Sequence, residues 1–272
     1  MSDDDRSSQR DTLITSPANP TIKFARSLHR KKVREHERAL LVEGARSVDS
    51  AISAGASVRA VIIDDARRDE IDRDLLNRIP ASARVVRVEH DLFESIALTE
   101  HPQALVAVID APDLPIRDDP TLVLVVDGVR DPGNLGTIIR SAGAVGADAV
   151  VLLSGTADHT NPKTVRATAG TLYAIPIRRF PSTERAVESL FVTQPIVAIA
   201  DAAAERSYDT VDWREPTVVV IGGEAFGASE QSRTYANLSV AIPIEAGVES
   251  LNAGVAASIL LFEVARRRRA TD

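Results

Sequence analysis

Three uninterrupted apolar runs in the second half of the chain restrict its fold more than any other feature. The runs are TLVLVV (121–126), AVVLL (149–153) and TVVVIG (217–222). A strand that is apolar at every position has both faces buried, as in a parallel sheet covered by helices on each side. Segments with helical patterns separate these runs, so we predict an α/β domain with a mostly parallel sheet.

The same alternation extends along the whole chain. In the C-terminal half we predict strands near 121–126, 148–153, 195–200, 216–221 and 238–242, and helices near 134–146, 161–169, 183–192 and 228–235. In the N-terminal half we predict strands at 39–44, 58–64, 83–88 and 105–110, and helices near 22–32, 45–54, 68–78 and 89–96. A last helix has Leu251, Val255, Ile259 and Phe262 at helical spacing, which predicts that these four side chains face the core.

The segment APDLPIRDDP (111–120) separates the two halves. It holds three prolines and three aspartates in ten residues, a composition that favours an irregular linker. We therefore predict a disordered, acidic tail at 1–15, a smaller α/β domain at 16–110 and a larger domain at 121–272.

Composition narrows the chemistry. The absence of cysteine excludes disulfides, thiolate metal sites and cysteine nucleophiles. The five histidines, at positions 29, 36, 90, 101 and 159, have no metal-ligand spacing, so we expect no metal. The N-terminus is unlike a signal peptide, and the apolar runs are too short to span a bilayer, so we expect a cytoplasmic protein without a membrane segment.

A basic stretch stands out on an otherwise acidic chain of formal net charge −7. Between residues 20 and 46, eight basic side chains face three acidic ones, which leaves a local charge of +5 (8 − 3). The basic residues are Lys23, Arg26, Arg30, Lys31, Lys32, Arg34, Arg38 and Arg46. Such a patch can bind phosphates, although a solvated helix face is the alternative explanation.

Three glycine-rich or polar turns follow predicted strands: DGVRDPGNLG (127–136), GGEAFGAS (222–229) and IEAGVESLNAG (244–254). The first has the glycine spacing of a P-loop but lacks its Lys-Ser/Thr pair, and it does not contain the G-x-G-x-x-G of dinucleotide sites. Ligands of open α/β sheets bind outside the carboxyl ends of the strands, so the three turns can form one site.

These turns, in this order, are similar to the motifs of the SpoU/TrmH family, within the SPOUT class of RNA methyltransferases. A looser match is NPKTVRATAGTLYAIPI (161–177), and together they cover essentially all of 121–265. The resemblance implies a C-terminal SPOUT domain with a deep trefoil knot, contrary to the general rule that chains do not thread loops. It also implies that the N-terminal domain is a ribosomal-protein-like substrate-binding domain, and that two copies form a homodimer through the C-terminal domain.

The resemblance further implies the cofactor S-adenosylmethionine and a set of site residues. The catalytic candidates are Asn134, Arg140, Glu224, Ser250 and Asn252. The cofactor-binding candidates are Gly222, Gly223, Ile242 and Leu251, with further contacts from the loop after the 195–200 strand. Gly223 stands where the family often has Asn or Ser, so we expect altered packing or affinity there.

The expected reaction is methyl transfer to a ribose 2′-hydroxyl of RNA, which we expect to be ribosomal. Because a guanidinium normally stays protonated, we expect Arg140 to bind the phosphate or the 2′-oxygen, oriented by Glu224, although a role as general base is the alternative. Two other functions remain open. One is a non-catalytic RNA-binding or ribosome-assembly protein on the same scaffold, and the other is a tRNA-modifying or base-methylating relative.

Overall fold

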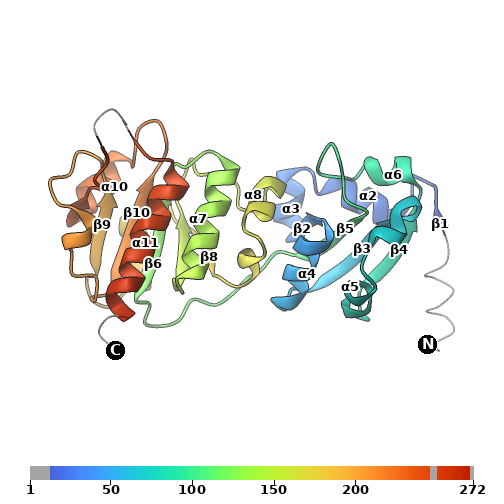
Figure 1. The fold of residues 1–272 in the computed structure, drawn as a ribbon, viewed down its shortest axis with the longest axis horizontal. Coiled ribbons are helices and arrows are strands. Elements are labelled where there is room, and N and C mark those ends of the chain that lie inside the picture. Colours follow the sequence, from blue (N-terminus) through green and yellow to red (C-terminus); the bar gives the residue numbers. More distant parts are fainter. Residues whose placement is uncertain (1–12, 246–249, 270–272) are drawn as a thin grey trace. The chain divides into compact units, whose positions relative to one another are not determined.

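The computed structural model describes residues 13–245 and 250–269. Contacts divide the chain into two compact units (Figure 1). Unit 1 comprises Met1–Pro112 and Thr160–Tyr173, and unit 2 comprises Asp113–His159 and Ala174–Asp272. Most of the predicted tail therefore lies outside the described residues, and the predicted linker at 111–120 has no helix or strand.

Unit 1 is built on a mixed five-stranded sheet of order β1-β4-β3-β5-β2. Its strands are β1 (Leu13–Ile14), β2 (Ala39–Glu43), β3 (Val58–Asp64), β4 (Arg84–Val88) and β5 (Leu105–Asp110). Strand β5 runs antiparallel to both β2 and β3, and the other pairs are parallel. Strand β1 falls inside the range predicted as tail, because its two residues pair with β4.

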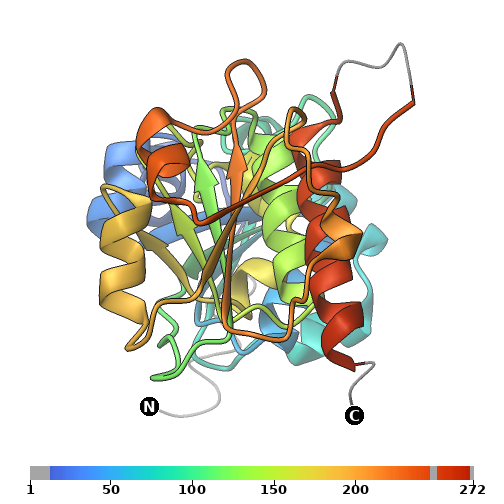
Figure 2. The same ribbon diagram turned by 90° about the vertical axis from the view of Figure 1, so that its left-hand side faces the viewer.

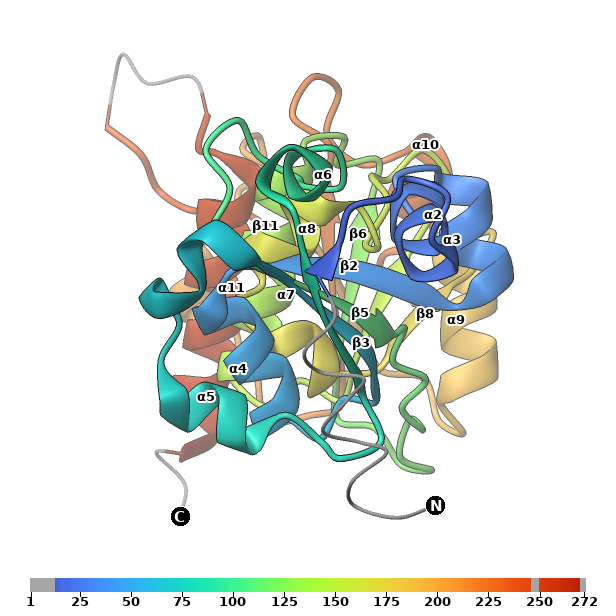
Figure 3. The same cartoon turned by 90° about the vertical axis from the view of Figure 1, so that its right-hand side faces the viewer.

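Helices cover both faces of this sheet (Figure 3). They are α2 (Pro20–Ser27), α3 (Lys31–Glu37), α4 (Ala45–Ser53), α5 (Arg73–Arg78), α6 (His90–Glu94) and α8 (Pro162–Ala167), with 3-10 turns η1 (Asp65–Glu70) and η2 (Thr171–Tyr173). One face packs against α2 and α6, and α4 and α5 lie on the other. Helix α8 joins this unit although it lies inside the range predicted for the C-terminal domain, because it packs on β2.

The single basic helix predicted at 22–32 is two helices, α2 and α3. The chain turns between them, and Arg34 closes the turn by donating from Nη1 to the carbonyls of Leu28 and His29, both at 2.9 Å. Its Nε donates to Thr160 Oγ1 at 3.1 Å, and the residue is only 4% exposed. Arg34 therefore stabilises the fold and is not part of a phosphate-binding surface, whereas the other seven basic residues of the patch are exposed.

Unit 2 contains the parallel sheet that the apolar runs predicted. Its order is β11-β9-β10-β6-β7-β8, and every neighbouring pair is parallel. The strands are β6 (Leu122–Asp127), β7 (Ala149–Leu152), β8 (Ile177–Arg179), β9 (Ile196–Ala200), β10 (Thr217–Gly222) and β11 (Leu238–Val240). Strand β8 was not predicted, because two of its three residues are arginines and the apolar pattern of a strand is missing.

Helices cover both faces of the parallel sheet (Figure 2). They are α7 (Pro132–Ala144), α9 (Thr183–Leu190), α10 (Glu230–Tyr235) and α11 (Ala253–Arg269), with a 3-10 turn η3 (Tyr208–Thr210). Leu122, Leu124 and Val126 of β6 pack toward α7 and α11, whereas Val123 and Val125 pack toward α9 and α10. Both faces of the central strand are buried, as its composition required.

The strand order brings the turns after β6, β10 and β11 together at the carboxyl ends of the parallel strands. The chain passes from β6 to β7 and β8 on one side, then returns to β9, β10 and β11 on the other. The order thus reverses between β6 and β10, and a crevice forms at such a switch point. The segment after β11 lies against the loop after β9, since Ala241 N donates to Arg206 O at 2.9 Å and Tyr208 N to Ala241 O at 3.0 Å. This path fits the SPOUT fold, for which the threading of the knot stays a prediction.

The prediction for the last helix was wrong about which face is buried. Val255 and Phe262 are 46% and 47% exposed, whereas Ala257, Leu260 and Leu261 are fully buried. Helix α11 is apolar around much of its circumference, so spacing alone did not identify the face that contacts the sheet.

The basic end of α11 is bound to the body of unit 2. Arg268 donates to the carbonyls of Thr121, Trp213 and Glu215, each at 2.9 Å. Arg266 and Arg267 both pair with the nearly buried Glu263, at 2.7 and 2.8 Å. The contacts of Arg268 fasten the helix end to the loops that precede β6 and β10, whereas the pairs with Glu263 lie within the helix.

Candidate active site

The turn after β6 positions the start of α7. Gly128 adopts a φ of +82°, which favours glycine, and its N–H donates to Thr156 Oγ1 at 3.0 Å. Asp131 then caps the helix by accepting a 2.7 Å hydrogen bond from the N–H of Asn134, and Pro132 occupies the first helical turn. The cap fixes Asn134 at the third position of the helix, close to the carboxyl end of β6.

Three of the predicted catalytic side chains form a hydrogen-bonded chain. Asn134 Nδ2 donates to Glu224 Oε1 at 2.7 Å, and Asn252 Nδ2 donates to Asn134 Oδ1 at 2.8 Å. Asn252 also caps α11, because its Oδ1 accepts from the N–H groups of Gly254 and Val255. We refer to Asn134, Glu224 and Asn252 as the polar cluster. It connects the three turns that the sequence singled out.

Glu224 is held as a carboxylate. Burial tends to raise its pKa, but hydrogen bonds from Asn134 and from the backbone of residues 224, 130 and 131 outweigh this effect, so the pKa lies below its usual value. One of these donors is Arg130 N, 3.4 Å from Glu224 Oε2. Glu224 thereby ties the turn after β10 to the turn after β6.

Arg140 does not join the polar cluster. It is exposed on α7, and within the described residues it makes no hydrogen bond or ion pair with Glu224. Six residues separate it from Asn134, which is about 9 Å along the helix axis and a different side of the helix. The expected pairing of Arg140 with Glu224 is therefore replaced by the pairing of Asn134 with Glu224.

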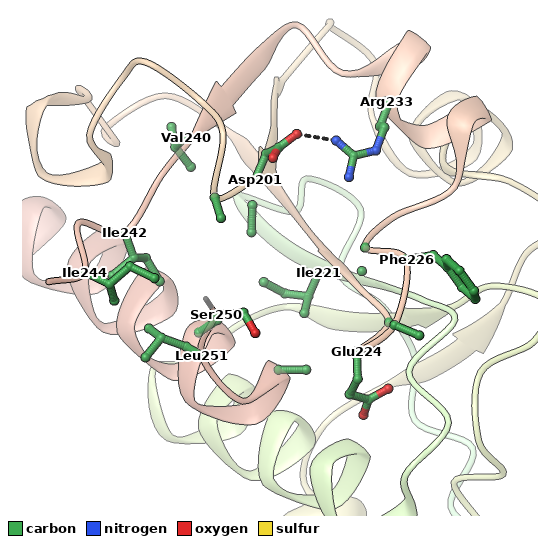
Figure 4. Close-up of a pocket in the computed structure, with 18 residues that line it drawn as sticks. Asp201, Ile221, Glu224, Phe226, Arg233, Val240, Ile242, Ile244, Ser250 and Leu251 are labelled. Carbon is green, nitrogen blue, oxygen red and sulfur yellow. Dashed lines mark hydrogen bonds and ion pairs between the residues drawn. The ribbon is translucent and has the colours of Figure 1, made fainter. Parts of the chain in front are cut away.

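A cavity of about 360 Å³ lies beside the polar cluster (Figure 4). The turn after β10 and the segment around β11 form its walls, and the start of α11 and the loop after β9 complete it. Among the predicted residues, Gly222, Gly223, Glu224, Ile242, Ser250 and Leu251 line it. Asn134, Asn252 and Arg140 are not among the lining residues.

Close packing explains the glycine pair at the end of β10. A Cβ atom on Gly222 would lie 2.0 Å from Ala228 N, and one on Gly223 would lie 2.4 Å from Gly128 O. Real side chains do not tolerate such distances, so both positions require glycine in this arrangement. The glycine at 223 thus allows the turns after β6 and β10 to touch.

Among the lining residues that were not predicted individually are Asp201, Phe226 and Arg233. Asp201 follows β9 and forms an ion pair with Arg233 (Figure 4). A backbone hydrogen bond from Ala203, followed by the contact with Arg233, lowers the pKa of Asp201. We expected cofactor contacts from the loop after the 195–200 strand, and Asp201 lies at the start of that loop. No sequence pattern pointed to Arg233 on α10.

The lining suits S-adenosylmethionine. Its volume falls within the range of about 300–1,000 Å³ that is typical of small-molecule sites. The side chains of Ile221, Val240, Ile242 and Leu251 provide an apolar wall for a flat adenine. The carboxylate of Glu224 favours a positively charged ligand, whereas the charge of Asp201 is balanced by Arg233.

Two features are absent from the described parts of the chain. No helix there is long and apolar enough to cross a membrane. No group of three or more histidine, aspartate or glutamate side chains in residues 13–245 and 250–269 is arranged to hold a metal ion.

Comparison with known proteins identifies both parts of the chain. Residues 121–262 match the model of the SpoU rRNA methylase family, and residues 19–107 match the MRM3-like substrate-binding domain. The 23S rRNA (guanosine(2553)-2′-O)-methyltransferase RlmP of Bacillus subtilis is 33% identical over 253 residues, covering 92% of this chain and 98% of the relative.

Solved structures agree with this assignment. The AdoMet-bound rRNA methyltransferase from Sinorhizobium meliloti has a TM-score of 0.79 at 31% identity, covering 94% of this chain and 97% of the other. The SpoU methyltransferase AviRb from Streptomyces viridochromogenes, in complex with AdoMet, has a TM-score of 0.80 at 30% identity, covering 93% and 99%. The sheet order, the polar cluster and these matches lead to one conclusion: the chain belongs to the SpoU rRNA methylase family.

Proposed function

We propose that this protein is an S-adenosylmethionine-dependent methyltransferase that methylates a ribose 2′-hydroxyl of ribosomal RNA. The observation that carries the proposal is the polar cluster at the edge of a cavity suited to the cofactor. Family membership and relatives whose names specify 23S rRNA 2′-O-methylation support it. We place the protein in the cytoplasm, the compartment of its RNA substrate.

In this proposal one part of the chain carries out methyl transfer and the other binds the RNA substrate. Residues 121–272 form the methyltransferase domain, and residues 16–110 form the substrate-binding domain, in line with the family models. Seven exposed basic residues of the N-terminal patch supply phosphate contacts that position RNA without reading its sequence.

The chemistry follows from alignment and charge. When bound, S-adenosylmethionine supplies a methyl group that is already electrophilic, so the protein mainly has to orient the acceptor and stabilise its developing negative charge. Gly222, Ile242 and Leu251 hold the cofactor against the end of the sheet. Asn134, fixed by Glu224 and Asn252, presents its amide at the site, and Ser250 adds a hydroxyl on the cavity wall.

Arg140 binds the RNA phosphate or the 2′-oxygen in this proposal. No partner within the described residues neutralises its guanidinium, which leaves it available to an anion. A guanidinium that stays protonated stabilises an oxyanion and does not accept its proton. Its distance from Asn134 along α7 means that it acts from the rim of the site or across an interface.

A homodimer through unit 2 provides such an interface. Val255 and Phe262 lie seven residues apart on α11, about two turns, and expose a strip of apolar surface. Helix α7, which carries Arg140, packs beside α11, where Ser141 Oγ and Ser258 Oγ are 2.7 Å apart. A second copy seated on this strip buries the two apolar side chains and brings Arg140 close to the interface.

The proposal is tested by methyl transfer from labelled S-adenosylmethionine to unmodified 23S rRNA transcribed in vitro. Nuclease digestion and mass spectrometry should find the label on ribose, and label on a base would contradict the 2′-hydroxyl assignment. Arg140→Ala should lower kcat by about 10²–10³-fold while circular dichroism and cofactor affinity stay as in the parent protein. Calorimetry without detectable cofactor binding would favour a non-catalytic RNA-binding protein instead.

A further inference from the structure

A second cavity, of about 240 Å³, adjoins the cofactor cavity. Its lining includes Asp127 and Arg130 from the turn after β6, and Glu224, Phe226 and Ser229 from the turn after β10. Glu224 and Phe226 line both cavities, so the turn at 223–227 forms the wall between them. A substrate group in the second cavity would thus lie next to the bound cofactor.

Phe226 stands at the tip of this wall and is 87% exposed. Two backbone hydrogen bonds, Gly223 N to Gly227 O at 3.1 Å and Gly227 N to Gly223 O at 3.0 Å, close the turn beneath it. The ring extends away from the apolar side chains of Ile242, Ile244 and Leu251 (Figure 4). A rigid turn therefore presents an aromatic face to solvent at the mouth of the site, where a flat partner could cover it.

Arg130 supplies a positive charge to the same cavity. Its side chain is exposed and makes no hydrogen bond or ion pair with any residue that the structure describes. The two carboxylates of the lining are already engaged. Asp127 Oδ2 accepts from Ser229 N at 2.9 Å and Ser229 Oγ at 2.6 Å, and Glu224 accepts from Asn134. The guanidinium of Arg130 is thus left for an external anion.

An exposed aromatic ring beside an unpaired guanidinium is the combination that binds single-stranded nucleic acid, by base stacking and phosphate contact. We propose that Phe226 stacks on an RNA base next to the acceptor nucleotide and that Arg130 binds a phosphate of the same strand. The inference rests on the proposed function, since it places the RNA strand beside the cofactor. Neither residue is a catalytic residue; both position the substrate.

The first test measures binding of the full-length protein to 23S rRNA transcribed in vitro. Phe226→Ala should weaken binding by about 5- to 150-fold, the range for loss of one stacked base. Phe226→Trp should retain affinity, and Phe226→Leu should behave like the alanine variant, because leucine is apolar but has no aromatic face. The matched control is Val192→Ala, which removes an apolar side chain that is 98% exposed outside both cavities.

The second test addresses the charge. Arg130→Gln should weaken binding and reduce the slope of log affinity against log salt by about 0.7, the value for one phosphate contact to a single strand. The matched control is Arg185→Gln on α9, an exposed arginine outside both cavities that pairs with Glu188.

The outcomes separate this inference from the proposed function. Unchanged RNA affinity in Phe226→Ala, or equal loss in Phe226→Trp and Phe226→Ala, overturns the stacking contact even if the parent enzyme methylates RNA. An unchanged salt slope in Arg130→Gln overturns the phosphate contact. Failure of the parent protein to bind S-adenosylmethionine overturns the proposed function, whereas the RNA titrations still decide this inference. Cofactor affinity, measured by calorimetry, should be equal in Arg130→Gln and in both control variants, because none of these three side chains lines the cofactor cavity.

Discussion

Replacing Arg268 with alanine should destabilise unit 2 far more than replacing its neighbour Arg269. Arg268 donates to three backbone carbonyls at 2.9 Å, from Thr121, Trp213 and Glu215, in addition to a 3.3 Å contact with Thr121 Oγ1. Burial lowers the pKa of Arg268, which indicates that the guanidinium is partly removed from water. Arg269 is exposed and makes no such hydrogen bond within the described residues.

The expected magnitude follows from these contacts. A typical hydrogen bond contributes about 0.5–1.5 kcal/mol net, and three bonds from one side chain are less than additive. Arg267 donates to the carbonyl of Asp209, so part of the attachment of the helix end survives. We therefore expect Arg268→Ala to lower the free energy of unfolding by about 2–3 kcal/mol, against less than about 0.5 kcal/mol for Arg269→Ala.

Urea unfolding followed by circular dichroism measures both variants at the same pH. For a unit of this size the expected loss corresponds to a decrease in Tm of about 4–12 °C. Equal stabilities of Arg268→Ala and Arg269→Ala would refute the reasoning, because they would show that the three carbonyls find equivalent partners in water.

Three further predictions concern the site and the interface. Gly223→Ala should weaken cofactor binding at least 10-fold in calorimetry, because its Cβ would lie 2.4 Å from Gly128 O. Gly146→Ala, whose Cβ meets open space but whose φ of +76° strains the backbone outside the cofactor cavity, should lower stability and leave cofactor affinity unchanged. The depressed pKa of Glu224 means that its carboxylate stabilises the fold above the unfolded value near 4.5, and that this contribution is lost as pH falls through the lower folded value. The stability difference between the parent protein and Glu224→Gln should therefore shrink as the pH falls below about 4.5, and a constant difference would be inconsistent with the assignment. Phe262→Glu should convert a dimer into a monomer in analytical ultracentrifugation, and an unchanged sedimentation coefficient would place the interface elsewhere.

Long apolar strands were the most predictable part of the fold. The ends of β3 and β5 coincide with the predicted ranges, and β6 and β10 are each shifted by one residue. Such strands are recognisable because burial on both faces demands apolar residues at every position. The short strands β1 and β8 were missed, since β1 has two residues and β8 has two arginines among its three, so neither carries a strand pattern. The equally short β11 was predicted because it begins the segment LSVAI.

Helices were predicted less well where tertiary contacts decide. The break between α2 and α3 depends on Arg34, whose hydrogen bonds to the turn are not visible in a run of basic residues. The buried face of α11 was misassigned because Leu260 and Leu261 compete with Val255 and Phe262 for the core, and only the packed sheet selects between them.

The polar cluster shows the same division. That Asn134, Glu224 and Asn252 belong together could be inferred from three turns at the carboxyl ends of parallel strands and from the family motifs. The hydrogen-bond partners within the site could not be inferred. Arg140 lies six positions after Asn134 on α7, which turns its side chain away from Glu224. Phe226 escaped notice for another reason, since exposure of an aromatic side chain is a property of the folded turn.

The hydrogen bond between Asn134 and Asn252 also sets an order of events during biosynthesis. Its two partners are 118 positions apart, and a ribosome adding about 5–20 residues per second needs about 6–24 s to pass from one to the other. During that interval the nascent chain contains the turn after β6 but not α11, so the polar cluster cannot form. A nascent enzyme that modifies ribosomal RNA would accordingly remain inert toward the particle that is translating it until α11 docks.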